Sequence, residues 1–178
     1  MAQDQSLPAI WLVSDQRNDA VLEDALARLP RRSGFIYRHY HLGGPERLAR
    51  FQTLRRIARA RDHAVILADS ALTAREWGAD GIYGPPRALY PTRRDLIRLA
   101  TVHNFTEVGM ANRYGCDAML LSPVFGTRSH PGGAGLGALR FRSLASHAMA
   151  PVIALGGMTE QLARTMNWPR WAAIDGLS

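Results

Sequence analysis

Short apolar runs alternate with amphipathic stretches along the whole chain, which is the pattern of repeated βα units around a parallel sheet. The apolar runs predict eight strands, at residues 9–14, 34–40, 63–67, 81–83, 99–102, 118–121, 151–155 and 172–174. Apolar residues at helical spacing predict helices at 21–29, 46–61, 71–77, 104–114, 138–147 and 159–166. Eight βα units indicate an α/β fold of the (β/α)8 TIM barrel type, with an open doubly wound sheet as the alternative.

The predicted barrel is compact and trimmed. The chain has 178 residues, whereas barrels of this type usually need roughly 200 to 250. Residues 84–98 hold Pro85, Pro86 and Pro91 and predict irregular coil in place of a regular helix. No full helix is predicted after the last strand, which would leave apolar surface uncovered, and such surface is normally buried against a partner. We therefore expect a single domain, residues 1–178, that forms a homodimer.

Composition and charge narrow the class of function. The only cysteine is Cys116, which excludes an internal disulfide and a cysteine-based zinc site. The N-terminus does not resemble a signal peptide and no apolar run has the length of a membrane span, so we expect a cytoplasmic location. The formal net charge of +7 would suit a nucleic acid, but aromatic residues are not interleaved with the basic ones as base stacking requires. We expect a phosphorylated small-molecule substrate, and neither a nucleic-acid nor a membrane partner.

In a barrel, functional groups lie at the carboxyl ends of the strands and in the loops that follow them. Gly156-Gly157 end the seventh predicted strand directly before a helix. Glycines at such a turn let backbone N–H groups approach a phosphate closely, so the motif predicts a phosphate site. The alternative interpretation is a tight turn without a ligand.

The sixth predicted strand is followed by a long loop, residues 122–137, which contains five glycines. Loops of this length in a compact domain are usually functional. Thr127, Arg128, Ser129 and His130 supply hydroxyl, guanidinium and imidazole groups that suit an anionic substrate. The loop is either a lid over a site or a solvated segment.

Three further positions at strand ends carry candidate chemistry. His103 directly follows the fifth strand and is either an acid–base group or a capping residue. His39 and His41 alternate along the second strand and share a face, but no third metal ligand stands at a telling spacing. Asp69 follows the third strand and could bind a magnesium ion together with substrate phosphates.

Three segments in order resemble the thiamine-phosphate synthase and thiazole tautomerase family. They are Gly-Ala-Asp-Gly-Ile at 78–82, Gly-Cys-Asp-Ala leading into Ser-Pro-Val-Phe-Gly-Thr over 115–127, and Pro-Val-Ile-Ala-Leu-Gly-Gly-Met at 151–158. Together they span most of the chain. The family fold is a (β/α)8 barrel, which agrees with the independent strand count.

The resemblance implies a reaction that couples an aminopyrimidine methyl diphosphate to a thiazole phosphate, with Mg²⁺ holding the diphosphate. Arg38 matches the arginine of the family's Gln-x-Arg-x-Lys strand, and Asp69 matches a metal-binding aspartate. The candidate catalytic residues are therefore Arg38, His103 and His130. The residues implied to surround the phosphates are Thr127, Ser129, Gly157, Leu177 and Ser178.

The chain departs from the family pattern mainly in its charged groups. Two cations, one metal-binding carboxylate and the acid–base histidine of the tautomerase branch are missing. The substituted positions are Ile36 for Gln, Tyr40 for Lys, Ala68 for Asn, residues 85–87 for the second Asp, Pro123 for the tautomerase His and His130 for the loop Lys.

Three functions therefore stay open. A divergent synthase would replace the lost charge with Arg38, Arg87, Arg128 and His130. A non-catalytic phosphate-binding or regulatory barrel would keep the Gly-Gly turn beside a degraded metal site. An acid–base enzyme acting on a phosphorylated heterocycle would use His103 or His130. Magnesium dependence separates the first function from the other two.

Overall fold

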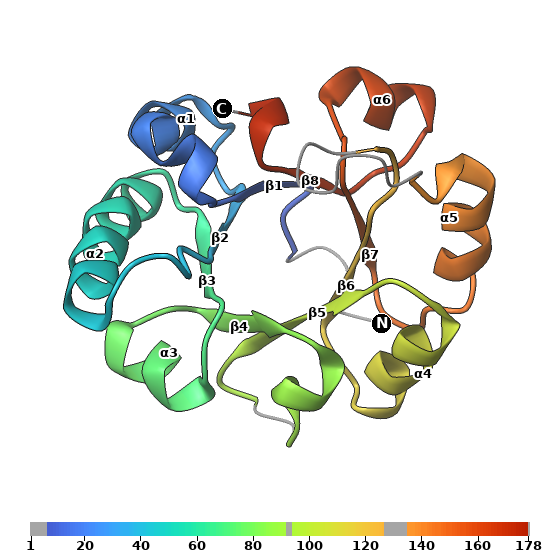
Figure 1. Cartoon of the computed structure of the whole chain (residues 1–178), viewed down its shortest axis with the longest axis horizontal. Coiled ribbons are helices and arrows are strands. Elements are labelled where there is room, and N and C mark those ends of the chain that lie inside the picture. The colour runs from blue at the N-terminus through green and yellow to red at the C-terminus, as the bar shows by residue number, and fades with distance from the viewer. Residues whose placement is uncertain (1–6, 92–93, 127–134, 178) are drawn as a thin grey trace.

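The eight predicted strands all form, and they close into one parallel barrel (Figure 1). The computed structural model describes residues 7–91, 94–126 and 135–177. Strand β1 pairs with β2 on one side and with β8 on the other, so the sheet has no free edge and the open-sheet alternative is wrong. The strands are β1 Ile10–Val13, β2 Gly34–Tyr37, β3 Ala64–Leu67, β4 Gly81–Gly84, β5 Ile97–Val102, β6 Ala118–Leu121, β7 Val152–Leu155 and β8 Trp171–Ala173.

The helices form an outer ring around the barrel, and each predicted helix is present within a few residues of its expected bounds (Figure 1). The α-helices are α1 Leu22–Arg28, α2 Gly44–Ala60, α3 Ala71–Trp77, α4 Phe105–Arg113, α5 Gly137–Ala145 and α6 Glu160–Thr165. Short 3₁₀ helices complete the ring: η1 Gln16–Val21, η2 Pro86–Leu89 and η3 Asp175–Leu177. The barrel is shortened at the two places that the sequence predicts. In the described part of the chain, η2 stands in place of an α-helix between β4 and β5, and η3 follows β8.

Strand β2 is shorter than its apolar pattern predicts. It ends at Tyr37 instead of Tyr40, because His39 adopts a φ of +37° and turns the chain out of the sheet. Non-glycine residues seldom have positive φ, and such backbone strain persists only where neighbouring contacts hold it. The prediction that 34–40 continues as one strand is therefore wrong over its last three residues, and the contacts of His39 explain the difference below.

Alternating strand residues build two apolar layers. One layer fills the barrel, and Trp11 lies over Gly34 there so closely that a Cβ on Gly34 would collide with the indole ring. The other layer lies between the strands and the helices and includes Phe35, Tyr37 and Phe51, which are all fully buried. This alternation also places residues of the site. Residues that continue the inner face beyond the end of β2, such as Arg38, reach the mouth of the barrel.

The homodimer prediction rests on uncovered apolar surface at the last strand, and the fold does not show such surface there. Trp171 and Ala173 point outward from β8, yet they are only 5% and 3% exposed because they belong to the buried outer layer. Leu177 packs against that same layer, and η3 lies between α1 and α6 in the ring (Figure 1). The dimer stays a prediction without this support. Among the described residues, no helix is long and apolar enough to cross a membrane.

Candidate functional site

A pocket of about 170 Å³ opens at the carboxyl ends of β7 and β8. Gly156 and Gly157 form one wall with φ values of +100° and +61°. This is the strand-end position at which the sequence predicts a phosphate site, and both glycines line it. The lining residues are Arg17, Gly126, Leu155, Gly156, Gly157, Met158, Ala173, Ile174, Asp175 and Gly176.

The glycines of this pocket are required by close backbone approach as well as by backbone angle. A Cβ on Gly157 would lie 2.8 Å from the carbonyl oxygen of Gly126, and a Cβ on Gly156 would lie 2.8 Å from the Cα of Pro123. The loops after β6 and β7 are thus in contact at main-chain level. Such a glycine-lined concavity leaves backbone groups open to an anion.

The cation of the pocket is Arg17, which the sequence alone did not single out. It belongs to η1, whose first turn is capped by the Asp15 side chain. Arg17 Nε donates to Asp15 Oδ1 at 2.9 Å, and its Nη1 lies 3.5 Å from Asp175 Oδ2 on the opposite wall. A bound phosphate would share Arg17 with the Asp175 carboxylate. The sequence did not indicate a role for Arg17, because η1 is a short loop helix that reaches the pocket only when the barrel closes.

A second pocket, of about 190 Å³, lies at the ends of β1 and β2 and holds Arg38. Arg38 Nε donates to the carbonyl of Ser14 at 3.0 Å, and Nη2 donates to Asp15 Oδ2 at 2.9 Å. Asp15 therefore binds one arginine of each pocket and links the two. The pKa of Asp15 is lowered, because hydrogen bonds and charge from Arg17 and Arg38 outweigh the opposing effect of burial.

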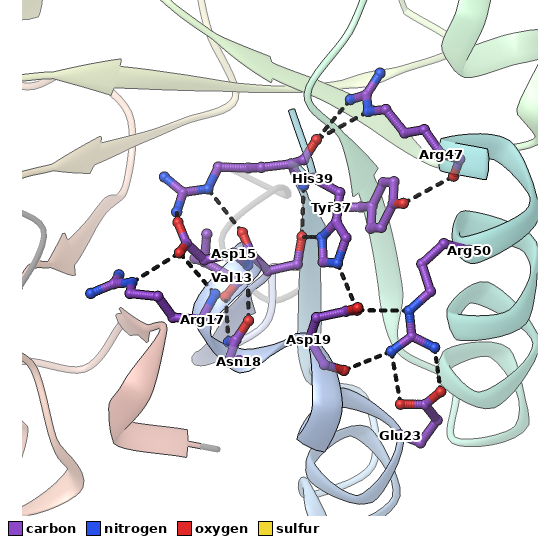
Figure 2. A network of polar contacts seen from close by, with 12 residues as sticks. Val13, Asp15, Arg17, Asn18, Asp19, Glu23, Tyr37, His39, Arg47 and Arg50 are labelled. Carbon is purple, nitrogen blue, oxygen red and sulfur yellow. Dashed lines mark hydrogen bonds and ion pairs between the residues drawn. The ribbon is translucent and has the colours of Figure 1, made fainter. Parts of the chain in front are cut away.

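The next residue after Arg38 is His39, a buried imidazole that is held on both of its nitrogens (Figure 2). His39 Nδ1 lies 2.8 Å from Ser14 Oγ, and Nε2 lies 2.7 Å from Asp19 Oδ1. Ser14 Oγ also accepts the backbone N–H of Arg38 at 2.8 Å. Burial lowers the pKa of His39 despite its carboxylate partner. The ring stacks on Tyr37 with centroids 4.7 Å apart.

The network continues to the helices through Asp19 (Figure 2). Arg50 on α2 donates from Nε to Asp19 Oδ1 at 2.7 Å and forms a two-pronged ion pair with Glu23 on α1. The bonds from His39 and Arg50 lower the pKa of Asp19 against the effect of burial. These contacts explain how His39 is kept at positive φ. His39 was considered only as a metal ligand from the sequence, and its partners Ser14, Asp19 and Arg50 carried no recognisable motif.

Asp69 lies at the end of β3, where a magnesium ligand is expected, but both of its oxygens are engaged. Oδ1 accepts the N–H of Ser70 at 2.7 Å, and Oδ2 accepts from Nη1 of Arg47. Burial acts to raise the pKa of Asp69, and these two hydrogen bonds more than reverse it. The described residues contain no group of three or more His, Cys, Asp or Glu side chains that could hold a metal ion. The Asp69 carboxylate is therefore already paired with Arg47, and the described residues do not build a metal site from protein ligands alone.

The other candidates lie apart from both pockets or outside the described residues. His103 lines neither pocket. Its Nδ1 and its backbone nitrogen lie 2.8 Å and 2.7 Å from Glu107 Oε2, at the start of α4. Leu177 directly follows the lining residue Gly176, and its side chain packs on the outer layer. Thr127, Ser129, His130 and Ser178 lie outside the described part of the chain.

Residues 10–168 match the thiamine monophosphate synthase family. The chain belongs to this family. "Putative thiamine-phosphate synthase 2" of Aquifex aeolicus is 30% identical over 86 residues. That match covers 46% of each chain, so it spans about half the length of this curated relative.

Solved structures agree on the fold. The thiamine phosphate pyrophosphorylase of Pyrococcus furiosus superposes with a TM-score of 0.77 at 22% identity, covering 98% of this chain and 87% of its own. The thiamine phosphate pyrophosphorylase of Bacteroides thetaiotaomicron gives a TM-score of 0.57 at 17% identity, covering 94% and 82%. The YdjI aldolase of Escherichia coli gives 0.65 at 11% identity, covering 97% and 77%. The barrel is thus shared with proteins outside the family, and the fold alone does not select a reaction.

Proposed function

We propose that this chain is a thiamine-phosphate synthase-like transferase, which couples an aminopyrimidine methyl diphosphate to a thiazole phosphate. The observation that carries the proposal is the glycine-walled pocket with Arg17, at the strand ends where barrels commonly bind phosphate. Membership of the thiamine monophosphate synthase family supports the choice of substrates.

The proposed reaction exchanges one bond for another. The bond between the pyrimidine methylene carbon and the diphosphate oxygen breaks, and its electron pair leaves with the diphosphate. The thiazole nitrogen then forms the new C–N bond with its lone pair, which gives thiamine phosphate and free diphosphate. No proton has to move, so the protein acts by positioning the reactants and compensating charge. A histidine tied to a carboxylate, like His103, is not needed for this step.

The two linked pockets give each reactant a place. We assign the thiazole phosphate to the cup of Gly156, Gly157 and Gly176, where Arg17 supplies positive charge. We assign the diphosphate to the pocket of Arg38. The bridging Asp15 keeps the two arginines in register, which would bring the reacting carbon and nitrogen together between them. Thr127, Ser129 and His130 follow Gly126 in the chain and are proposed to complete the phosphate contacts.

A turnover assay tests the proposal. Purified protein is mixed with both substrates, with and without magnesium, and thiamine phosphate is measured by chromatography. We expect product, and we expect Arg38→Ala to lower kcat/KM by about 100-fold, the usual effect of losing one charge-stabilising donor. Arg75→Ala is the matched control, because Arg75 is an exposed residue of α3 that pairs with Asp95.

The absence of product would overturn the synthase assignment. If thiazole phosphate then still raised the Tm of the protein, and did so less in Arg17→Ala, the chain would be a phosphate-binding barrel without this activity. That second function has support of its own in the closed Asp69 site, where the metal ligand of the family is already paired.

A further inference from the structure

Arg47 on α2 fastens the carboxyl ends of β2 and β3 to each other. Its Nε and Nη2 donate to the carbonyl oxygen of Arg38 at 3.1 Å and 2.9 Å, and Nη2 also donates to the carbonyl of Ala68 at 3.0 Å. Its Nη1 binds the Asp69 carboxylate. One guanidinium thus serves the strand end that carries Arg38 and the strand end that carries Asp69.

Aromatic rings enclose this guanidinium. Its Cζ lies 5.8 Å from the ring centroids of Tyr37 and Tyr40, and 5.5 Å from that of Trp77. The Arg47 side chain is only 11% exposed. Guanidinium groups bind favourably to aromatic faces and planar carboxylates at once, which a hydrated ammonium or metal ion does not reproduce. Arg47 is therefore a fixed part of the fold and not a mobile surface charge.

A metal ion bound to Asp69 Oδ2 would take the place of Arg47 on that oxygen. The guanidinium would then lose its carboxylate partner in a largely buried position and keep only its three hydrogen bonds to carbonyl oxygens. An unpaired buried charge is strongly destabilising, so this exchange is unfavourable. At the end of β4, where the family resemblance implies a second carboxylate, the chain continues as Gly84-Pro85-Pro86.

The local charge is nevertheless conserved relative to the arrangement that the family resemblance implies. Two aspartates and one divalent cation sum to zero. Here Asp69 and the guanidinium of Arg47 also sum to zero. Arg47 therefore leaves this strand end without a net negative charge toward an anionic ligand.

We propose that Arg47 is the resident cation of this site and that the protein binds a diphosphate group without a divalent cation. The proposal rests on the proposed function for the choice of diphosphate as ligand. Arg47 acts in two ways: it neutralises Asp69, which would otherwise repel the ligand, and it holds the main chain of Arg38, whose guanidinium lines the pocket. Arg38 makes the direct contact, and Arg47 is a positioning and charge-compensating residue.

Isothermal titration calorimetry with inorganic diphosphate tests this directly. We expect wild-type protein to bind diphosphate in the presence of EDTA. Arg47→Met keeps an apolar stem among the three rings and removes the charge, and we expect it to weaken binding at least about tenfold. Arg56→Met is the matched control, since Arg56 is an exposed residue of the same helix, and its affinity should equal that of wild type.

Asp69→Asn keeps the test decisive if Arg47→Met does not fold. The amide oxygen can still accept from Arg47, while the Ser70 N–H loses its acceptor, and an amide is a poor magnesium ligand. Diphosphate binding in EDTA should therefore stay within about threefold of wild type. Binding that requires magnesium and is lost in Asp69→Asn would overturn the proposal, as would a folded Arg47→Met with unchanged affinity. Turnover tests the proposed function separately. Product that forms only with magnesium would support the synthase assignment and overturn the proposal that Arg47 is the resident cation. Diphosphate binding in EDTA without turnover would support the resident cation and overturn the synthase assignment.

Discussion

His39 Nε2 lies 2.7 Å from Asp19 Oδ1, and this pair fixes the tautomer of a fully buried imidazole. The lowered pKa of Asp19 makes it a carboxylate that only accepts, so Nε2 carries the proton. A neutral ring must then accept at Nδ1, which makes the Ser14 hydroxyl the donor at 2.8 Å. Ser14 Oγ in turn accepts the N–H of Arg38. Every proton from Asp19 to the backbone of Arg38 is thereby assigned.

Ser14→Ala tests this assignment. Ser14 is 0% exposed, so its loss leaves the Arg38 N–H without an acceptor and His39 Nδ1 without a donor. We expect the free energy of unfolding to fall by about 1–3 kcal/mol, the usual cost of buried unsatisfied polar groups. Urea denaturation measures it. Ser146→Ala is the control, because the exposed Ser146 hydroxyl donates to the carbonyl of Ser143 and otherwise lies only 3.4 Å from His147 Nδ1, and its effect should stay within about 0.5 kcal/mol.

Two buried histidines set the pH dependence of stability. Burial lowers the pKa of His39 and of His63 below the ordinary 6.5, so both are neutral in the folded protein where the unfolded chain would already take up a proton. Below about pH 6.5 the unfolded state therefore binds more protons, and stability falls as the pH falls. We expect the midpoint of urea unfolding to decrease steadily between about pH 7 and pH 5.

Substitution of each histidine separates the two contributions. His39→Asn tolerates the positive φ and removes one titrating group, so the pH slope should become shallower without vanishing. The remaining slope belongs to His63, whose nitrogens bond the carbonyl of Leu26 and the N–H of Ser33. A slope that His39→Asn leaves unchanged would show that His39 takes up its proton over the same pH range in the folded and the unfolded protein.

The barrel could be predicted from sequence because its signal is local and repeated. Runs such as Ala118–Leu121 are apolar at every position, as strands covered on both faces must be, and that strand forms with the expected bounds. The Gly156-Gly157 turn carried its own signal for the same reason, since its backbone angles require glycine. Strand ends were less predictable: the apolar pattern past Tyr37 could not reveal that His39 leaves the sheet.

The charged part of the site could not be predicted, because its pairs are distant in sequence. Arg47 and Asp69 lie on different βα units, so their ion pair leaves no spacing signal in the sequence. Arg17 becomes part of the pocket at the ends of β7 and β8 only when β8 pairs with β1 and brings Asp175 beside it. The family resemblance predicts a metal ligand at Asp69, but only the three-dimensional fold reveals that Arg47 pairs with its carboxylate.

Gly34 and Gly109 should respond in opposite directions to the same substitution. A Cβ on Gly34 would overlap the ring of Trp11 in the barrel interior, so Gly34→Ala should cost about 1–3 kcal/mol by overpacking. Gly109 lies within α4 with open space at its Cβ position, so Gly109→Ala should add about 0.5–1 kcal/mol of stability. Urea denaturation of both variants checks the sign of each change.

Gly157→Ala should damage the proposed phosphate pocket more than the fold, and Gly115→Ala provides a control with the same backbone angle. Both glycines have a φ of +61°, so each alanine carries a strain of roughly 1–2 kcal/mol. Only Gly157 faces a close neighbour, the carbonyl of Gly126, whereas nothing lies within contact distance of a Cβ on Gly115. Relief of that clash must separate the loops after β6 and β7, which widens the cup.

We therefore expect thiazole phosphate to bind Gly157→Ala about tenfold more weakly by calorimetry and to bind Gly115→Ala as it binds wild type. Equal affinities in the two variants would mean that the phosphate does not sit against this turn.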